Sequence, residues 1–152
     1  MSVDFYVAVP ADQWPTLAAV EQCASRKGYP IKVRRFPVLD AQKVVTDGAS
    51  VAVDGNDAYL EGQLSPSSLS AEEVRWINER LAASTAPFRI SDRHALMSIH
   101  VRRSTELRAA SYVIASLVVC FGGYGFEPQG NAHGRADFAK ALIEGAALLK
   151  GP

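Results

Sequence analysis

The feature that most restricts the fold of this chain is a run without any charged side chain, which extends from Ala109 to Phe126. Its length, roughly 18 residues, is about the shortest that can cross a membrane as a helix. Glycines at 122, 123 and 125 interrupt the run, and successive glycines end helices. We therefore predict a helix that is apolar nearly all round and buried in a core, followed by a short buried strand.

The composition is that of a globular chain with a single core. The chain has 152 residues, of which 48% are hydrophobic and 21% charged, and this balance excludes a disordered or fibrous protein. Lys plus Arg equals Asp plus Glu at 16 each, so no overall field attracts the chain to nucleic acid or to an anionic membrane. We expect neither nucleic acid nor a membrane as a partner.

Hydrophobic periodicity predicts an α+β fold, with one domain over residues 1–152. Alternating or short apolar runs predict strands, and apolar stripes at helical spacing predict helices. The elements follow the order βαβ-ββ-α-ββ-α-β-α, a mixed or antiparallel sheet packed with about four helices. The expected strands are 3–9, 31–38, 51–54, 57–64, 88–90, 96–103 and 124–127, and the helices lie within 12–28, 70–81, 104–121 and 135–150.

Local signals predict how several elements begin and turn. Gly55-Asn56 suits the positive φ of a two-residue hairpin turn. Ser70 and Glu73 have the spacing of a capping box, and Asp12 and Ser104 are expected helix caps. Pro37 places the 31–38 strand at a sheet edge, because proline cannot donate to a neighbouring strand.

The two cysteines are predicted to remain unpaired. Cys23 and Cys120 lie in apolar helical patterns and form no C-x-x-C motif or dense framework. Cys120 has apolar neighbours, which favours an inert core residue over a nucleophile. The first residues also lack the features of a secretory signal, so the cytoplasm is the expected compartment.

No metal, cofactor or phosphate site is predicted from residue spacing. His94 and His100 are six positions apart on one strand, which separates them by roughly 20 Å, too far to share a metal. The Gly122–Gly125 segment follows a helix and precedes a strand. A phosphate loop has the opposite order, so we interpret these glycines as a helix cap.

The segment from Glu127 to Arg135 is the best candidate for a small-ligand site, because it ends at a helix N-terminus. With Arg102 from the neighbouring strand face, its polar residues would bind a small anion: Asn131, His133 and Arg135. His133 and His100 would transfer protons. The competing interpretation is a surface loop that only connects two elements.

Acidic residues are concentrated between Asp47 and Glu73, where there is no Lys or Arg, and a basic segment precedes them. Such a patch can steer a charged protein even when the net charge is zero. We expect Asp54, Asp57 and Glu61 to contact a partner. The competing interpretation is a solvated surface.

Two functions remain open. The first is a non-catalytic protein-interaction domain, because no nucleophile, metal or cofactor pattern is recognisable. Small bacterial immunity proteins, which neutralise a partner protein, have the same general make-up, although no motif ties this chain to them. The second is a small enzyme or anion-binding domain at the 127–135 segment. A concave pocket around His133 would favour the second function, and a flat acidic surface the first. The strand edge at 31–37 would also allow a homodimer.

Overall fold

The computed structural model describes residues 2–149 and shows an α+β fold built on one antiparallel sheet in the order β2-β3-β4-β5-β1-β6-β7. The predicted fold class is confirmed. The strands are β1 (Val3–Pro10), β2 (Ile31–Arg35), β3 (Ala49–Val53), β4 (Asn56–Pro66), β5 (His94–Val101), β6 (Tyr124–Glu127) and β7 (Ala132–Gly134). The α-helices are α1 (Leu17–Lys27), α2 (Ala71–Ala82), α3 (Ser104–Phe121) and α4 (Ala136–Leu148). Short 3-10 turns occupy Ala11–Gln13 and Ser67–Leu69.

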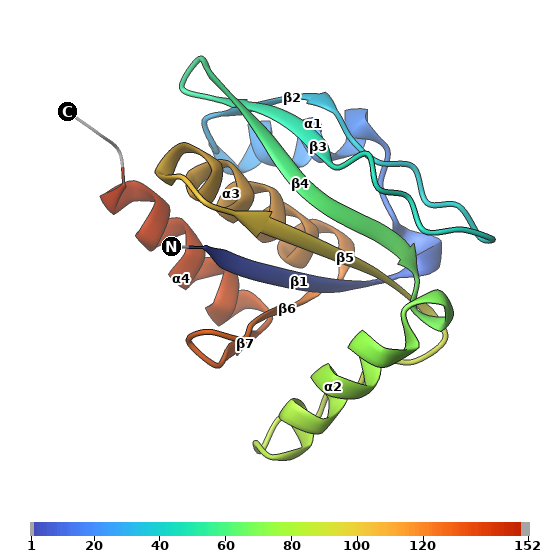
Figure 1. Cartoon of the computed structure of the whole chain (residues 1–152). Coiled ribbons are helices and arrows are strands. Elements are labelled where there is room, and N and C mark those ends of the chain that lie inside the picture. Colours follow the sequence, from blue (N-terminus) through green and yellow to red (C-terminus); the bar gives the residue numbers. More distant parts are fainter. Residues whose placement is uncertain (1, 150–152) are drawn as a thin grey trace.

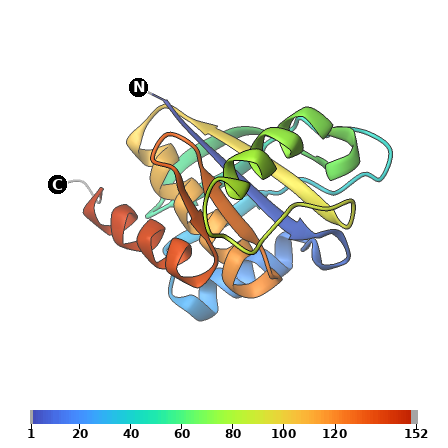
Figure 2. The same cartoon turned by 90° about the horizontal axis from the view of Figure 1, so that it is seen from below.

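The two faces of the sheet are covered unequally. Helices α1, α3 and α4 lie behind the sheet in Figure 1, and we call the face they cover the inner face. Helix α2 lies on the opposite, outer face, where it packs over β1, β5 and β6 through a separate apolar cluster. Figure 2 shows the sheet between these two sets of helices. The outer face of β3 and β4 carries no helix (Figure 1).

Strand β5 shows why the sheet has this asymmetry. Met97, Ile99 and Val101 are buried on the inner face, whereas Ser98 and His100 point to the outer face. Alternation of this kind is expected when one face meets a core and the other meets solvent. The predicted alternation is confirmed, although the strand starts two residues earlier, at His94.

Helix α3 is the centre of the inner layer. Every residue from Arg108 to Val118 is buried, and Gly122 ends the helix in the left-handed conformation, with φ of 73°. Among the described residues, α3 is the one helix long and apolar enough to span a membrane, yet 61% of that window is buried in the fold. The prediction of a core helix is therefore confirmed, and the fold is consistent with a soluble protein.

The β3–β4 hairpin turns one residue earlier than predicted. Asp54 and Gly55 have φ of 51° and 80°, and Val53 pairs with Asn56. Two positive φ values in succession are typical of a type I′ turn, for which Asp-Gly is a preferred pair. The turn chemistry was predicted correctly, but the register was not.

The helix caps differ from their predictions. Thr16, rather than Asp12, accepts from the backbone N–H of Ala19. The Ser70 side chain makes no cap hydrogen bond and pairs with the Ser65 hydroxyl instead. Short polar side chains have several backbone and side-chain partners within reach, and tertiary contacts decide among them.

At the start of α3, the backbone N–H groups are bound by Glu106 and not by the predicted cap, Ser104. The Glu106 carboxylate accepts hydrogen bonds from the backbone N–H groups of Arg102 and Arg103, at 2.8 and 3.3 Å. A carboxylate in the first turn of a helix is favoured by the helix dipole.

Two segments have a different secondary structure from that predicted. Residues 88–90 form no strand, because the Asn78 side chain binds both the N–H and the carbonyl of Ile90. The predicted 128–134 loop contains β7, which pairs with β6 as a hairpin. The last helix spans Ala136–Leu148, and its predicted end at Lys150 lies outside the described residues.

The cysteine prediction was wrong. Cys23 in α1 and Cys120 in α3 form a disulfide across a sequence separation of 97 residues. Both cysteines lie on helices of the inner layer, and the packing of α1 against α3 brings them together. Spacing along the chain carries no signal for such a contact, because it depends on how the two helices cross.

Candidate binding site on the outer face

A hollow of about 370 Å³ lies on the outer face above α2. The sheet register forms its floor, since Glu61 stands opposite His100 and Gln63 opposite Ser98. Directly opposed residues of antiparallel strands point to the same side. One wall comes from Glu73 of α2, and another comes from the loop between β2 and β3. The lining residues are Thr46, Glu61, Gly62, Gln63, Glu73, Ser98 and His100.

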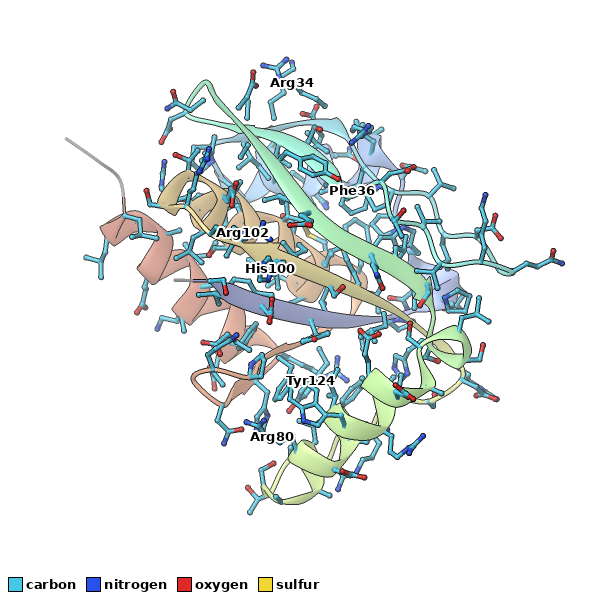
Figure 3. All side chains as sticks on the ribbon, viewed as in Figure 1. Arg34, Phe36, Arg80, His100, Arg102 and Tyr124 are labelled. Atoms are coloured by element: carbon cyan, nitrogen blue, oxygen red, sulfur yellow. A yellow bond between two sulfur atoms is a disulfide. The ribbon has the colours of Figure 1, made fainter. Side chains whose placement is uncertain are left out.

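His100 is held by a carboxylate from the next strand. Asp4 of β1 pairs with His100 in the register, and Asp4 Oδ1 is hydrogen-bonded to His100 Nδ1. Gln129, in the β6–β7 turn, accepts from the Asp4 backbone N–H at 3.3 Å. His100 and Arg102 both lie in front of β5 in Figure 3. The floor of the hollow is therefore extended by a polar row across β4, β5 and β1.

Glu61 is paired with the arginine that follows β5. Arg102 Nη1 donates to Glu61 Oε2 at 2.6 Å, and the two side chains are 58% and 54% exposed. The hydrogen bond and the charge of Arg102 lower the pKa of Glu61 from its usual value. Glu61 is therefore an ionised carboxylate at neutral pH, with one of its oxygens bound to Arg102.

The hollow has a negative character. Glu61 and Glu73 line it, and Asp4 lies behind His100. The pKa of Tyr6 is raised, first by burial and then by the charges of Glu73 and Asp4. Glu73 and Asp4 are therefore close enough to act on the same neighbouring side chain.

Two aromatic side chains flank the hollow and remain partly exposed. Tyr59 precedes Glu61 by two positions on β4 and is 47% exposed. Its hydroxyl donates to the Asp47 carbonyl at 2.9 Å, and the Arg35 guanidinium lies 5.8 Å from its ring centre. On the other side, Trp76 is 38% exposed and lies one helical turn after Glu73.

The other two predicted partner-binding carboxylates are separated from this hollow. Asp54 turns toward the inner face, where it accepts from Arg108 Nη1 at 2.8 Å, and Arg108 is only 7% exposed. Asp57 pairs with Arg34 at 3.0 Å on the exposed hairpin. Asp54 and Asp57 therefore do not face each other across the turn. Contact of Asp54, Asp57 or Glu61 with a partner stays a prediction.

The polar side chains of the 127–135 segment bind other parts of the protein. Arg80 Nη2 donates to Asn131 Oδ1 at 3.3 Å, and the Tyr124 hydroxyl is hydrogen-bonded to His133 Nδ1 at 2.8 Å. Arg135 Nη1 donates to the Gly122 carbonyl at 3.0 Å. Figure 3 places Tyr124 and Arg80 between α2 and the β6–β7 hairpin. The bond from Arg80 holds the hairpin against α2, and the other two hold it together and attach it to the end of α3.

Ser98, His100 and Asp4 are residue types found in nucleophilic triads. A triad requires the serine hydroxyl within hydrogen-bond reach of the histidine. In residues 2–149 the hydrogen bonds of His100 connect it to Asp4 and not to Ser98. The same part of the chain contains no group of three or more His, Cys, Asp or Glu residues placed to hold a metal ion.

Sequence reasoning placed His100 and Arg102 on one strand face but assigned Glu61 to a separate acidic patch. Gln63, Ser98 and Thr46 were missed, and they carry no signal beyond being polar residues on strands or in a loop. Glu73 was assigned to a capping box and to an acidic segment, but not to a site with His100. The sequence matches no protein-family model, and neither a curated protein nor a solved structure matches the chain.

Proposed function

We propose that this chain is a non-catalytic protein-binding domain whose outer face receives a lysine or arginine side chain from its partner. The observation that carries the proposal is the hollow between β4, β5 and α2, which Glu61 and Glu73 line. Arg102 pairs with one carboxylate oxygen of Glu61, and Asp4 adds a further carboxylate nearby. A cationic side chain entering this hollow would meet opposite charge and several hydrogen-bond acceptors.

The aromatic side chains beside the hollow support a protein partner. Tyr59 and Trp76 are large, amphipathic and partly exposed, and such residues are enriched where proteins bind each other. Small-molecule sites are usually more apolar and more enclosed. The outer face therefore suits a broad contact in which one cationic side chain is anchored.

The edges of the sheet are poorly suited to pairing with a strand of a partner, which favours binding through the outer face. The backbone N–H of Val33 on edge strand β2 donates to Glu21 Oε1 at 2.6 Å, and that of Ile31 donates to the Tyr29 carbonyl. These donors are not free for an added strand. The opposite edge, β7, has only three residues. A homodimer formed by pairing of the β2 edges, which the sequence allowed, has less support.

An immunity-type role is one special case of this proposal, in which the partner is a toxin with a basic surface. Its readout is survival of cells that produce the toxin together with this chain.

The cytoplasmic prediction is a separate question. It rested on unpaired cysteines and on the lack of secretory-signal features, and the Cys23–Cys120 disulfide removes the first of these supports.

Glu73 and Glu72 provide a matched test. Both lie in the first turn of α2 and interact similarly with the helix dipole, but Glu73 lines the hollow whereas Glu72 is exposed and does not line it. The tagged wild-type, Glu73→Lys and Glu72→Lys proteins would be purified from the native cells at low and high salt. Bound protein would be quantified by mass spectrometry.

The proposal predicts a stoichiometric partner that binds the wild type and Glu72→Lys, is lost at high salt, and is reduced at least tenfold by Glu73→Lys. A tenfold loss corresponds to about 1.4 kcal/mol, a modest value for reversing a charge at an interface. Equal retention by the two variants would place the binding surface elsewhere. Unfolding curves of the two variants should coincide with each other, because both lose a favourable charge at the N-terminus of α2. This match separates lost binding from lost structure.

The alternative, a small enzyme or anion-binding domain at the 127–135 segment, has one favourable observation. Gln129 of this segment contacts the Asp4–His100 pair, so the segment and the strand face do meet. Arg135 and Arg102, however, already bind carbonyl or carboxylate groups of the protein. Titration with inorganic phosphate, followed by NMR shifts of the Arg135 and His100 side chains, tests this alternative.

A further inference from the structure

The disulfide between α1 and α3 is unevenly accessible to solvent. Cys23 is completely buried, whereas Cys120 is only half-buried. Cys120 is the penultimate residue of α3, and its neighbour Val119 is 39% exposed. A thiolate from solvent can therefore approach the sulfur of Cys120 more readily than that of Cys23.

Helix α1 also protects the edge of the sheet. Glu21, two positions before Cys23, accepts from the backbone N–H of Val33 at 2.6 Å. Val20 and Ala24 of the same helix are fully buried. The disulfide fixes α1 to the core helix α3. Through Glu21, α1 in turn binds a backbone N–H on the unpaired edge of β2.

We propose that the Cys23–Cys120 disulfide is a redox-responsive crosslink, opened through Cys120, which holds α1 and the β2 edge in place. The reductant is a protein dithiol of the thioredoxin class. Its first thiolate attacks the sulfur of Cys120, and the bond to Cys23 breaks with the electron pair leaving on Cys23. Its second thiolate then attacks the first sulfur of the dithiol in this mixed disulfide, and Cys120 leaves as a thiolate. The dithiol is oxidised to a disulfide, and both cysteines take up a proton.

The consequence depends on the compartment. In oxidising surroundings the crosslink persists, and α1 stays fixed. In a reducing compartment the crosslink opens, and α1 is held only by its non-covalent packing. The Val33 N–H of an edge strand then becomes exposed more often, which is a risk for unwanted strand pairing. This proposal is independent of the partner proposed above.

The test uses the purified full chain, first incubated with oxidised glutathione, before and after treatment with a reduced thioredoxin-type dithiol. Iodoacetamide labelling with mass spectrometry counts free thiols, and hydrogen exchange follows the amides of α1 and β2. We expect no free thiol before treatment and two after it. A variant of the dithiol protein that lacks the second thiol should instead be trapped as a mixed disulfide on Cys120. We also expect at least tenfold faster exchange at Val33 and a melting temperature lower by roughly 10 °C.

The Cys23→Ser/Cys120→Ser variant is the control for direct effects of the reductant. It should exchange at Val33 as the reduced protein does and should not respond to the dithiol. Two labelled thiols in the untreated protein would overturn the proposal, as would unchanged exchange at Val33 after complete reduction. If the double variant fails to fold, the comparison of oxidised and reduced wild type still decides the matter.

Discussion

The inner and outer faces of the sheet differ in what their side chains do. On the inner face, Met97, Ile99 and Leu60 are almost completely buried under α1, α3 and α4. On the outer face, the neighbouring positions are Ser98, His100 and Glu61, which line a hollow open to solvent. Both sets come from the same two strands. At these positions, the inner side of each strand stabilises the fold, while the outer side lines the hollow open to solvent.

The ion pairs of the hairpin strand show the same contrast. Asp54 reaches the inner side and pairs with the buried Arg108, whose Nε also donates to the Ala146 carbonyl. Burial lowers the pKa of Arg108, but the bonds to Asp54 and contact with Tyr112 outweigh this and raise it. Glu61, on the outer side, pairs with an exposed arginine. The ion pair is buried and structural on the inner side, and exposed to solvent on the outer side.

The largest expected difference between the faces concerns adjacent residues of β5. Met97→Ala removes a side chain that is 1% exposed and should lower the free energy of unfolding by about 3 kcal/mol. Ser98→Ala, one position later on the outer face, should change it by less than about 0.5 kcal/mol. Urea unfolding of both variants measures the contrast. Similar losses would show that position 98 is also part of the stabilising core.

A second difference is expected between two carboxylates of the hairpin. Asp54→Lys places a cation beside the buried guanidinium of Arg108 and should cost about 3 kcal/mol. Asp57→Lys disturbs an exposed pair with Arg34, whose side chains are 53% and 79% exposed, and should cost less than about 0.5 kcal/mol. Thermal unfolding of the two variants compares them directly. If Asp54→Lys proved neutral, Asp54 would be free to contact a partner after all.

The smallest expected effect concerns the pH dependence of Glu61. Arg102 lowers the Glu61 pKa in the folded state, so this pair stabilises the fold above the unfolded-state pKa of the carboxyl group. That contribution is lost as the pH falls through the lowered folded-state pKa. NMR titration should give a Glu61 pKa below 4.5, and Arg102→Ala should return it toward 4.5. An unchanged pKa in the variant would mean that the pair does not persist in solution.

The sequence was most informative for single helices or strands whose buried side follows from their own hydrophobic pattern. The apolar run from 109 onward predicted the buried helix α3, and the alternation around Met97 predicted both faces of β5. Such patterns need no knowledge of neighbouring elements, because the periodicity of a helix or strand alone selects the buried side. Caps and turns were less certain, since Ser70 and Asp12 had several possible partners.

The candidate site could be predicted only in part from the sequence. His100, Arg102 and Glu61 were recognised as polar residues, but the register of β4 against β5 places Glu61 opposite His100. The position of α2 then brings Glu73 to the same hollow. These arrangements bring together residues that are far apart in the chain, and no local sequence pattern specifies them.

By itself, the sequence determined the α+β class, the core helix and the side of β5 that is buried, because each depends on local periodicity and the removal of apolar surface from water. Only the tertiary structure decided the sheet order, the disulfide between Cys23 and Cys120, and the grouping of carboxylates on the outer face. These features arise from contacts between distant segments, and their geometry is set by how helices and strands pack together.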